Sequence, residues 1–324
     1  MNQTWQELSQ QIEAEISREN FSGHPKELYD PIGYTMKLGG KRIRPTLCLL
    51  ANQLFQGNEQ IALHLAMAIE VFHNFTLVHD DIMDEAPLRR GKAAVHKKWN
   101  RDIAILSGDV MMVMTNKLLC KAQPQHLSAI LEIFNQTAIE VCEGQQLDMN
   151  FESSSTVSAN DYIEMIRLKT AVLLACSLKM GAINANASEK DSSLLYNFGD
   201  KIGIAFQIQD DYLDCYANPE DFGKRVGGDI ISNKKTFLYL KALEKASDSQ
   251  RKEIEELTSK EIKEEEKVAK MLAIYNDLNI PDEAKLAMEN YYNEAMESMN
   301  QISVSAELKQ PLIDLAQMLM NRER

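Results

Sequence analysis

Apolar residues recur at intervals of three and four along almost the whole chain, which is the spacing of an amphipathic or buried α-helix. One such series runs from Leu63 to Val78 and another from Leu194 to Ile208. Strand-like alternation of apolar and polar residues is nearly absent. The eight prolines fall mostly where helices would begin or in loops. The pattern predicts an all-α protein, a large bundle of roughly ten to twelve helices around an apolar cavity.

Smaller features within this pattern suggest where the helices begin and end. Asn160 and Asp161 are expected to cap a helix that reaches about Met180. The polar stretch 151–156 is interpreted as a connection, and the charged segment 241–270 as solvated helical faces. No repeat occurs at a solenoid period. We therefore expect a single domain spanning residues 1–324.

The charge balance excludes one class of partner. The chain has 324 residues, 44% of them hydrophobic, and a formal net charge of −13, which argues against nonspecific nucleic-acid binding. Basic residues nevertheless gather at 41–44, 89–90, 97–98 and 234–235. An acidic protein that concentrates cations in this way is expected to bind a small anion.

The cysteines and the N-terminus suggest a compartment. The five cysteines are an odd number without CxxC spacing and lie in apolar helical patterns, so we expect buried free thiols in a reducing cytosol. Residues 1–20 do not have the pattern of a signal peptide. No uncharged apolar run approaches the ~20 residues of a membrane span. A cytoplasmic protein without a transmembrane segment is expected.

Two aspartate clusters with the same DDxxD motif are the strongest indication of function in the sequence. Each ends an apolar helical series, and the helical spacing puts the first and last carboxylates on one face, roughly 6 Å apart. Such carboxylates repel each other unless a strong positive charge binds there, and hard oxygen ligands suit Mg²⁺. Mg²⁺ held by few carboxylates usually completes its shell with water and substrate phosphates, which suggests that a diphosphate is bound. The clusters are Asp80, Asp81 and Asp84, and Asp210, Asp211 and Asp214.

Several basic and polar motifs accompany the clusters. The loop 39–45 (GGKRIRP) precedes an apolar helix, and its Lys41 and Arg44 would hold phosphate. By itself, each motif also has a structural interpretation, such as salt bridges for the adjacent arginines or a neutral core position for the histidine. The other candidates are His73, Arg89, Arg90, Lys169, Thr170, Gln207, Lys224 and Lys234.

Taken together, the chain resembles the trans-isoprenyl diphosphate synthases, the polyprenyl synthetase family that includes farnesyl and geranylgeranyl diphosphate synthases. The resemblance implies the isoprenoid synthase fold, usually a homodimer, with a deep apolar pocket. It also implies Mg²⁺-dependent head-to-tail (1'-4) condensation of isopentenyl diphosphate with dimethylallyl, geranyl or farnesyl diphosphate. The motifs that carry it, in family order, are GGKRIRP (39–45), DDIMD with RRG (80–91), the KT pair (169–170), FQIQDDYLD (206–214) and GK…NKKT (223–236).

The resemblance assigns roles to these residues. The aspartates, chiefly Asp80, Asp84 and Asp210, would hold about three Mg²⁺ ions (or Mn²⁺) on the allylic diphosphate, and Thr170 and Gln207 would place oxygen dipoles near the allylic cation. The basic residues would form two groups, each of which binds one of the two substrates. Arg89, Lys169, Lys224 and Lys234 would contact the allylic diphosphate, whereas Lys41, Arg44, His73 and Arg90 would bind isopentenyl diphosphate.

Product length is expected to depend on the helix that precedes the first cluster. Phe75 lies five residues before Asp80, about 7.5 Å along the helix axis, and Phe72 lies about one turn further. The aromatic Phe75, five positions before the first aspartate, and the small Thr76, four positions before it, resemble the pattern of archaeal-type geranylgeranyl diphosphate synthases in this family. We therefore expect a C20 product, with farnesyl diphosphate (C15) as the alternative.

Three other functions would leave different marks in the sequence. A terpene cyclase of class I also uses DDxxD, but it usually lacks the GGKRxRP loop and the second DDxxD. A noncatalytic subunit of a heteromeric prenyl synthase would be expected to lose aspartates or the basic loop. A purely structural bundle would leave the acidic triplets without counter-charges. All six aspartates and the basic motifs are present, which favours the synthase.

Overall fold

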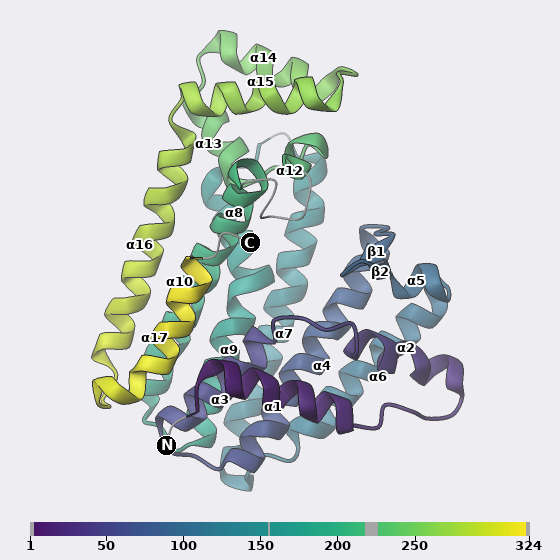
Figure 1. Cartoon of the computed structure of the whole chain (residues 1–324), viewed down its shortest axis with the longest axis vertical. Helices are drawn as coiled ribbons and strands as arrows, with labels where there is room; N and C mark the ends of the chain where they lie inside the picture. The colour runs from purple at the N-terminus through teal and green to yellow at the C-terminus, as the bar shows by residue number, and fades with distance from the viewer. Residues whose placement is uncertain (1–2, 155, 218–225, 322–324) are drawn as a thin grey trace. The chain divides into compact units, whose positions relative to one another are not determined.

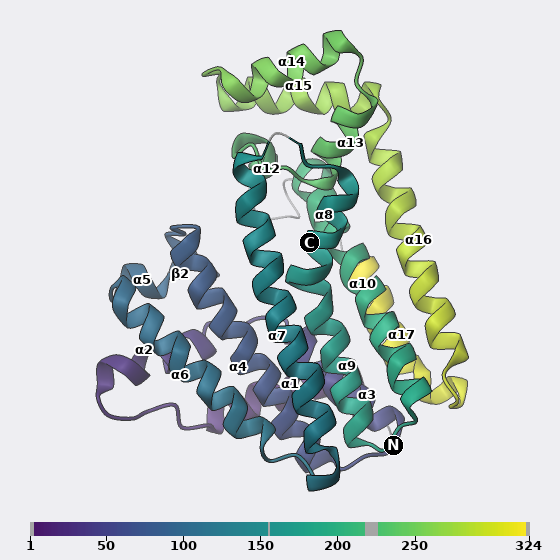
Figure 2. The same ribbon diagram turned by 180° about the vertical axis from the view of Figure 1, so that it is seen from behind.

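The computed structural model describes residues 3–154, 156–217 and 226–321. The chain forms two compact units, each built from discontinuous segments. The first contains Met1–Asn135, Cys176–Leu195 and Ile302–Ile313, and the second contains Gln136–Ala175, Tyr196–Gln301 and Asp314–Arg324. Both are helical, which confirms the all-α prediction (Figures 1 and 2). The expected single domain stays a prediction, because a compact unit is not necessarily an independently folding domain.

The first unit is organised around helix α4 (Glu59–Met83), against which α3 and α6 pack. Asn58 caps this helix by accepting a hydrogen bond from the Ile61 amide. An 18-residue window of α4 is apolar and long enough to cross a membrane, but 61% of it is buried inside the structure, as in a core helix. The other helices that begin between residues 1 and 135 are α1 (Trp5–Arg18), α2 (Lys26–Met36), α3 (Ile43–Leu54), α5 (Val95–Lys98), α6 (Arg101–Leu119) and α7 (Pro124–Ser153).

A short hairpin follows the first aspartate cluster and was not expected from the sequence. Strand β1 (Leu88–Arg89) pairs antiparallel with β2 (Lys92–Ala93). The two turn residues, Arg90 and Gly91, have φ angles of 52° and 73°, which are typical of a type I′ hairpin. Two-residue strands are too short to show an alternating pattern, so the Arg-Gly turn was the only sequence signal.

The second unit contains the segment that includes Lys169. Ser158, rather than Asn160 or Asp161, caps α8 (Ala159–Ile166) in a capping box with Asp161. The predicted helix to Met180 is divided by a π-helical turn, η1 (Arg167–Ala171), before α9 (Val172–Asn184). The other helices of this unit are α12 (Gly228–Ile231), α13 (Phe237–Lys245), α14 (Asp248–Ser259), α15 (Glu264–Asp277) and α16 (Ile280–Gln301). Two further helices, α10 (Glu189–Tyr216) and α17 (Ala306–Met320), begin in the first unit and end in the second.

These interruptions change two expectations. The described residues form more helical segments than the roughly ten to twelve expected, because short helices such as α5 and α12 are separate elements. The segment 151–156 is helical through Ser153, so the connection begins later than expected. Within the second unit, α14 and α15 lie side by side (Figures 1 and 2).

The cysteines differ partly from the expectation. All five are free thiols, as predicted, and Cys48, Cys176 and Cys215 are buried. Cys120 and Cys142 are exposed, so the prediction of burial is wrong for these two. Cys120 caps the C-terminal end of α6 and is thus at the surface where a helix ends.

Candidate active site

In the first unit, the aspartates of α4 have different environments. Asp84 is the C-terminal cap residue of the helix and is exposed, and Asp80 is half-buried one turn earlier. Asp81 is buried at 3% exposure. Both Nε and Nη2 of Arg89 donate to its Oδ1 atom, with the Nε contact at 3.0 Å. The hairpin therefore holds Arg89 on the middle aspartate of the cluster.

The Arg44 guanidinium and the His73 imidazole lie together in the same unit. The Arg44 Nη1 and His73 Nε2 atoms are 3.3 Å apart. Burial lowers the pKa of Arg44 to about 10, so this arginine keeps its charge at neutral pH. Burial, followed by the charges of Arg44, Arg90 and other arginines, lowers the pKa of His73 well below its usual range. The pair therefore consists of a charged arginine and a neutral histidine, which suits the binding of an anion.

The backbone of the glycine loop 39–45 lies close to the Arg90 guanidinium. Gly40 has φ +140°, and a Cβ added there would lie 2.8 Å from the Arg90 guanidinium carbon. A side chain at Gly40 would therefore displace Arg90. A Cβ added at Gly39, where φ is +81°, would meet no atom within 4 Å. The close approach of backbone to guanidinium thus explains the glycine at position 40 in particular.

Arg42 has a structural role that the sequence did not reveal. It is 3% exposed and bonds Glu70, Glu13 and the Met36 carbonyl oxygen, with its Nε 2.7 Å from Glu13 Oε1 and its Nη2 2.8 Å from Met36 O. It also caps α3 with a left-handed backbone, φ 49°. A paired, buried arginine of this kind fixes the loop that carries Lys41 and Arg44.

The aromatic residues below the first cluster pack against one another. Phe72 is 1% exposed, and its ring centroid lies 5.7 Å from that of Phe75 and 5.0 Å from that of Phe134. The half-buried Phe75 also contacts His79, with ring centroids 4.7 Å apart. The Thr76 hydroxyl donates to the His73 carbonyl oxygen at 2.8 Å. Phe75 is therefore held between two rings rather than free to rotate.

In the second unit, Lys169 lies in the π-helical turn η1. Its Nζ atom is 2.6 Å from Asp148 Oδ2 on α7. The contact is possible because Gly144 lets α7 approach the Lys169 backbone, where an added Cβ would be 2.3 Å from the Lys169 nitrogen. Asp148 was not predicted, because α7 carries many polar residues and nothing in the sequence distinguishes this aspartate from the others. Single π-helical turns occur often at functional sites.

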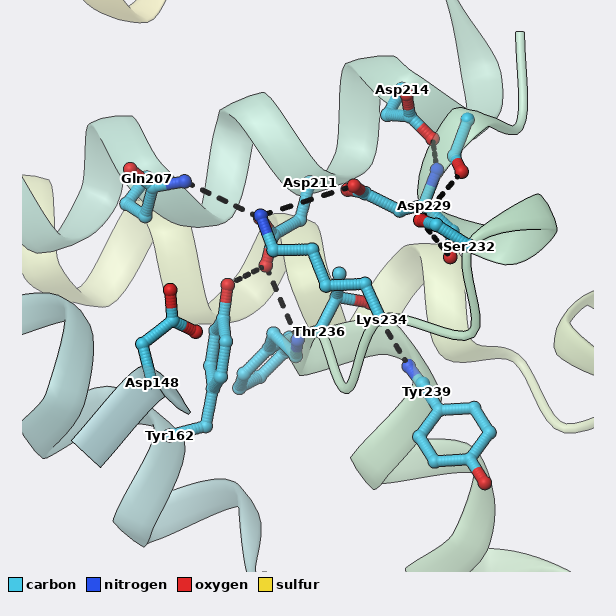
Figure 3. A network of polar contacts seen from close by, with 12 residues as sticks. Asp148, Tyr162, Gln207, Asp211, Asp214, Asp229, Ser232, Lys234, Thr236 and Tyr239 are labelled. Atoms are coloured by element: carbon cyan, nitrogen blue, oxygen red, sulfur yellow. Dashed lines mark hydrogen bonds and ion pairs between the residues drawn. The ribbon is translucent and has the colours of Figure 1, made fainter. Parts of the chain in front are cut away.

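Asp211 is the centre of a buried network in the second unit (Figure 3). It is 2% exposed and accepts hydrogen bonds from the Tyr162 hydroxyl at 2.6 Å and the Phe237 amide at 3.2 Å. Burial raises its pKa to about 7, against the effect of these two donors, which lower it. Tyr162 was also missed, because a tyrosine at a buried helical position has no distinguishing sequence signal.

The same network connects the two residues predicted to face the reacting carbon. The Gln207 amide donates to Asp211 Oδ1 at 3.5 Å, and Gln207 Oε1 accepts from the Thr170 hydroxyl, also at 3.5 Å. These distances are long for hydrogen bonds. Because the Thr170 hydrogen is directed to Gln207, the lone pairs of the Thr170 oxygen stay available for another group.

The end of α10, the short helix α12 and the segment that follows α12 carry further charges. Asp214 accepts a hydrogen bond from the Asp229 amide at 2.9 Å, and the Asp229 carboxylate lies 4.0 Å from Lys234 Nζ (Figure 3). The adjacent Lys235 donates to backbone carbonyl oxygens at the end of α7, including that of Phe151. Lys235 therefore caps a helix, whereas Lys234 is exposed. Lys224 lies outside the described residues, and Asp210 is half-buried on α10.

The carboxylate oxygens of the two aspartate clusters are the atoms that could bind Mg²⁺. Within residues 3–154, 156–217 and 226–321, no three histidine, cysteine or acidic side chains lie together as a cation site. Mg²⁺ is commonly held by one or two carboxylates plus water and phosphate oxygens, so a denser cluster is not required. Asp80 and Asp84, which are less buried than Asp81, fit this type of binding. The buried Asp81 and Asp211 already have protein partners.

Comparison with known proteins agrees with this arrangement. A family model described as polyprenyl synthetase matches residues 25–275. A geranylgeranyl diphosphate synthase of Sulfolobus acidocaldarius is 35% identical over 91% of this chain and 90% of its own length. A short chain isoprenyl diphosphate synthase of Methanothermobacter thermautotrophicus is 35% identical over 92% and 91%.

Solved structures give the same result for the fold. A crystal structure of a geranylgeranyl pyrophosphate synthase has a TM-score of 0.94 at 41% identity and covers 100% of both chains. The geranylgeranyl pyrophosphate synthetase of Pyrococcus horikoshii has a TM-score of 0.91 at 31% identity, covering 98% of each chain. The match of the family model over most of the chain, together with relatives above 30% identity over nearly its full length, shows that the chain belongs to the polyprenyl synthetase family.

Proposed function

We propose that the protein is a prenyltransferase that condenses isopentenyl diphosphate with allylic diphosphates and releases geranylgeranyl diphosphate, the C20 product. The observation that carries the proposal is the retention of both DDxxD clusters and all the basic motifs in a chain of this family. The relatives named geranylgeranyl diphosphate synthase, at 35–41% identity, support the C20 product.

The first unit supplies the cations for isopentenyl diphosphate. Lys41, Arg44 and Arg90 would attract the diphosphate, and the neutral His73 beside Arg44 would donate or accept one hydrogen bond. Gly40 keeps the backbone close to Arg90, so the loop and the guanidinium form one surface. These groups hold the substrate in place while its double bond attacks the allylic carbon.

The second unit supplies groups for the allylic substrate. Lys169, together with Lys224 and Lys234, would stabilise the charge that grows on the leaving diphosphate. The oxygen atoms of Thr170 and Gln207 would face the allylic cation, oriented by the hydrogen bonds that lead to Asp211. The C–O bond to the diphosphate breaks, a C–C bond forms, and a proton leaves to the released diphosphate. No side-chain base is therefore required.

Magnesium would be held chiefly by Asp80, Asp84 and Asp210, about three ions per site with Mn²⁺ as a substitute. When bound, the metal neutralises charge on the leaving diphosphate. Asp81, Asp211 and Asp214 would support the cluster, since Arg89, Tyr162 and the Asp229 amide already hold them. Arg89 would reach the allylic diphosphate from its place beside Asp81.

The setting of the enzyme is part of the same proposal. We expect a homodimer in the cytoplasm that has no transmembrane segment, acts on isopentenyl and allylic diphosphates and binds no nucleic acid. The burial of 61% of the most apolar window of α4 supports the absence of a transmembrane segment among the described residues.

A condensation assay on the purified chain alone tests the proposal. With isopentenyl diphosphate, an allylic diphosphate and Mg²⁺, we expect incorporation that is lost when the metal is chelated. Asp84→Asn should lower kcat by about 100-fold or more. The matched control is Asp109→Asn on α6, also exposed, which should keep native activity. No turnover by the chain alone, with any allylic starter, would favour a noncatalytic subunit instead.

A further inference from the structure

A large cavity in the first unit is lined by none of the residues assigned to the reaction. Its volume is about 950 Å³, and it lies between α2, the loop before α2, strand β2 and the end of α5. Positions 29, 30, 33 and 34 of α2 line it from one face of the helix, and positions 37 and 38 line it just after the helix ends. The cavity is large enough for a ligand of nucleotide or prenyl size.

Aromatic rings form one wall of the cavity. Tyr34 and Trp99 meet edge to face, with ring centroids 5.4 Å apart and planes at 70°. The Tyr34 hydroxyl donates to the Ala93 carbonyl oxygen at 2.8 Å, which ties this wall to strand β2. Both rings are half-buried, so part of each faces the cavity. A flat or apolar ligand body would pack on these rings.

Three lysines, Lys37, Lys92 and Lys98, line the same cavity. None of them forms an ion pair with a carboxylate in the described part of the chain. The Lys98 ammonium lies 3.7 Å from the Tyr34 ring centroid and 4.8 Å from that of Trp99. A cation–π contact orients the ammonium without neutralising its charge. The lining also includes Glu19 and Asp30, so lysines exceed carboxylates by one.

We propose that this cavity binds a small organic phosphate, with its body on Tyr34 and Trp99 and its anionic head on Lys92 and Lys98. Aromatic rings beside unneutralised lysines complement a ligand that is apolar at one end and multiply charged at the other. A nucleotide and a prenyl diphosphate share this chemistry. The site is separate from the residues proposed for condensation, so its test does not depend on that activity.

Tryptophan fluorescence provides a local probe, because the chain has only two tryptophans. In the Trp5→Phe variant of the full chain, Trp99 is the sole emitter. We expect ATP or geranylgeranyl diphosphate, titrated separately, to change its emission to saturation. The ligand that does so identifies the source of the organic phosphate, and inorganic diphosphate should bind at least tenfold more weakly than that ligand.

Matched lysine variants in the same background decide whether the cavity is the site. Lys98→Ala and Lys92→Ala should each raise the Kd at least fivefold. Lys97→Ala, next to Lys98 but outside the cavity lining, should change it less than twofold. The proposal is overturned if neither organic phosphate gives a saturable change, if inorganic diphosphate binds equally well, or if all three lysine variants bind alike. Circular dichroism checks that each variant is folded.

Discussion

At the residue scale, the middle aspartate of each DDxxD cluster differs from its neighbours. Asp81 and Asp211 are both buried, the first with Arg89 and the second with Tyr162 and the Phe237 amide. The spacing along a helix indicated only which carboxylates share a face. It gave no information on their partners, which come from segments distant in the sequence. The metal-binding role predicted for these two residues stays a prediction.

Phe75 provides the residue-level test of product length. Its ring is held between Phe72 and His79, and we predict that it limits the growing chain. Phe75→Ala should therefore yield products longer than those of the native enzyme, measured by mass spectrometry with the same starter. Phe55→Ala, at the C-terminal cap of α3, is the control and should leave product length unchanged. Equal product lengths for Phe75→Ala and native protein would show that another residue closes the pocket.

His73 gives a prediction for the dependence of stability on pH. Its pKa is lowered well below 6.5 in the folded protein, chiefly by burial, so the unfolded chain binds more protons when the pH falls below that value. The stability that the neutral imidazole contributes is present above pH 6.5 and lost on acidification, by at most about 1.4 kcal/mol per pH unit.

Urea unfolding at pH 7 and pH 5.5 measures this effect. The native protein should lose more unfolding free energy between these values than His73→Gln. The pKa values of His64 and His96 are also lowered, but both residues are present in the two proteins, so their effects cancel in the comparison. Equal losses in the two proteins would contradict the assignment of a neutral His73 in the folded protein.

At the element scale, the sequence predicted long helices well and irregular elements poorly. Helices α4 and α10 follow directly from apolar periodicity and end in the aspartate clusters, as expected. The π-helical turn at Lys169 and the hairpin at Arg89 were missed, because each depends on tertiary contacts rather than on local pattern. Both irregular elements carry candidate site residues, so the local sequence pattern failed to predict the structure at positions where a function is expected.

The glycine loop before α3 is tested by paired substitutions. Gly40→Ala would force the Arg90 guanidinium to move, since the added Cβ would lie 2.8 Å from its carbon. We expect the KM for isopentenyl diphosphate to rise by about tenfold, equivalent to ~1.4 kcal/mol. Gly39→Ala also imposes strain at positive φ but meets no neighbour, so its KM should rise less. Equal KM values for the two variants would show that backbone strain alone, and not the displacement of Arg90, raises the KM.

The hydrogen bond between α8 and α10 is tested by Tyr162→Phe. This change leaves the buried Asp211 without its 2.6 Å donor and should cost about 1–3 kcal/mol of unfolding free energy. Because Asp211 also holds Gln207, kcat should fall by roughly 10- to 100-fold. Tyr292→Phe, a half-buried tyrosine in the same unit, should change neither quantity appreciably. Native kcat in Tyr162→Phe would show that this network does not orient the site.

At the scale of the whole molecule, the family could be predicted from the sequence because its motifs are numerous and occur in a fixed order. The helical fold followed from periodicity alone. The sequence did not reveal Asp148, Tyr162 or the cavity beside Trp99, since each depends on segments brought together by folding. Short motifs thus identified the chemistry, while the supporting residues required the structure.

The product distribution of the purified chain tests whether the protein makes geranylgeranyl diphosphate. Incubation with isopentenyl diphosphate, each allylic starter in turn and Mg²⁺, followed by mass spectrometry, should give geranylgeranyl diphosphate as the longest major product. Dimethylallyl, geranyl and farnesyl diphosphates should all lead to this C20 end point. Accumulation of farnesyl diphosphate with no C20 product, or no condensation from any starter, would show that the protein is not a geranylgeranyl diphosphate synthase.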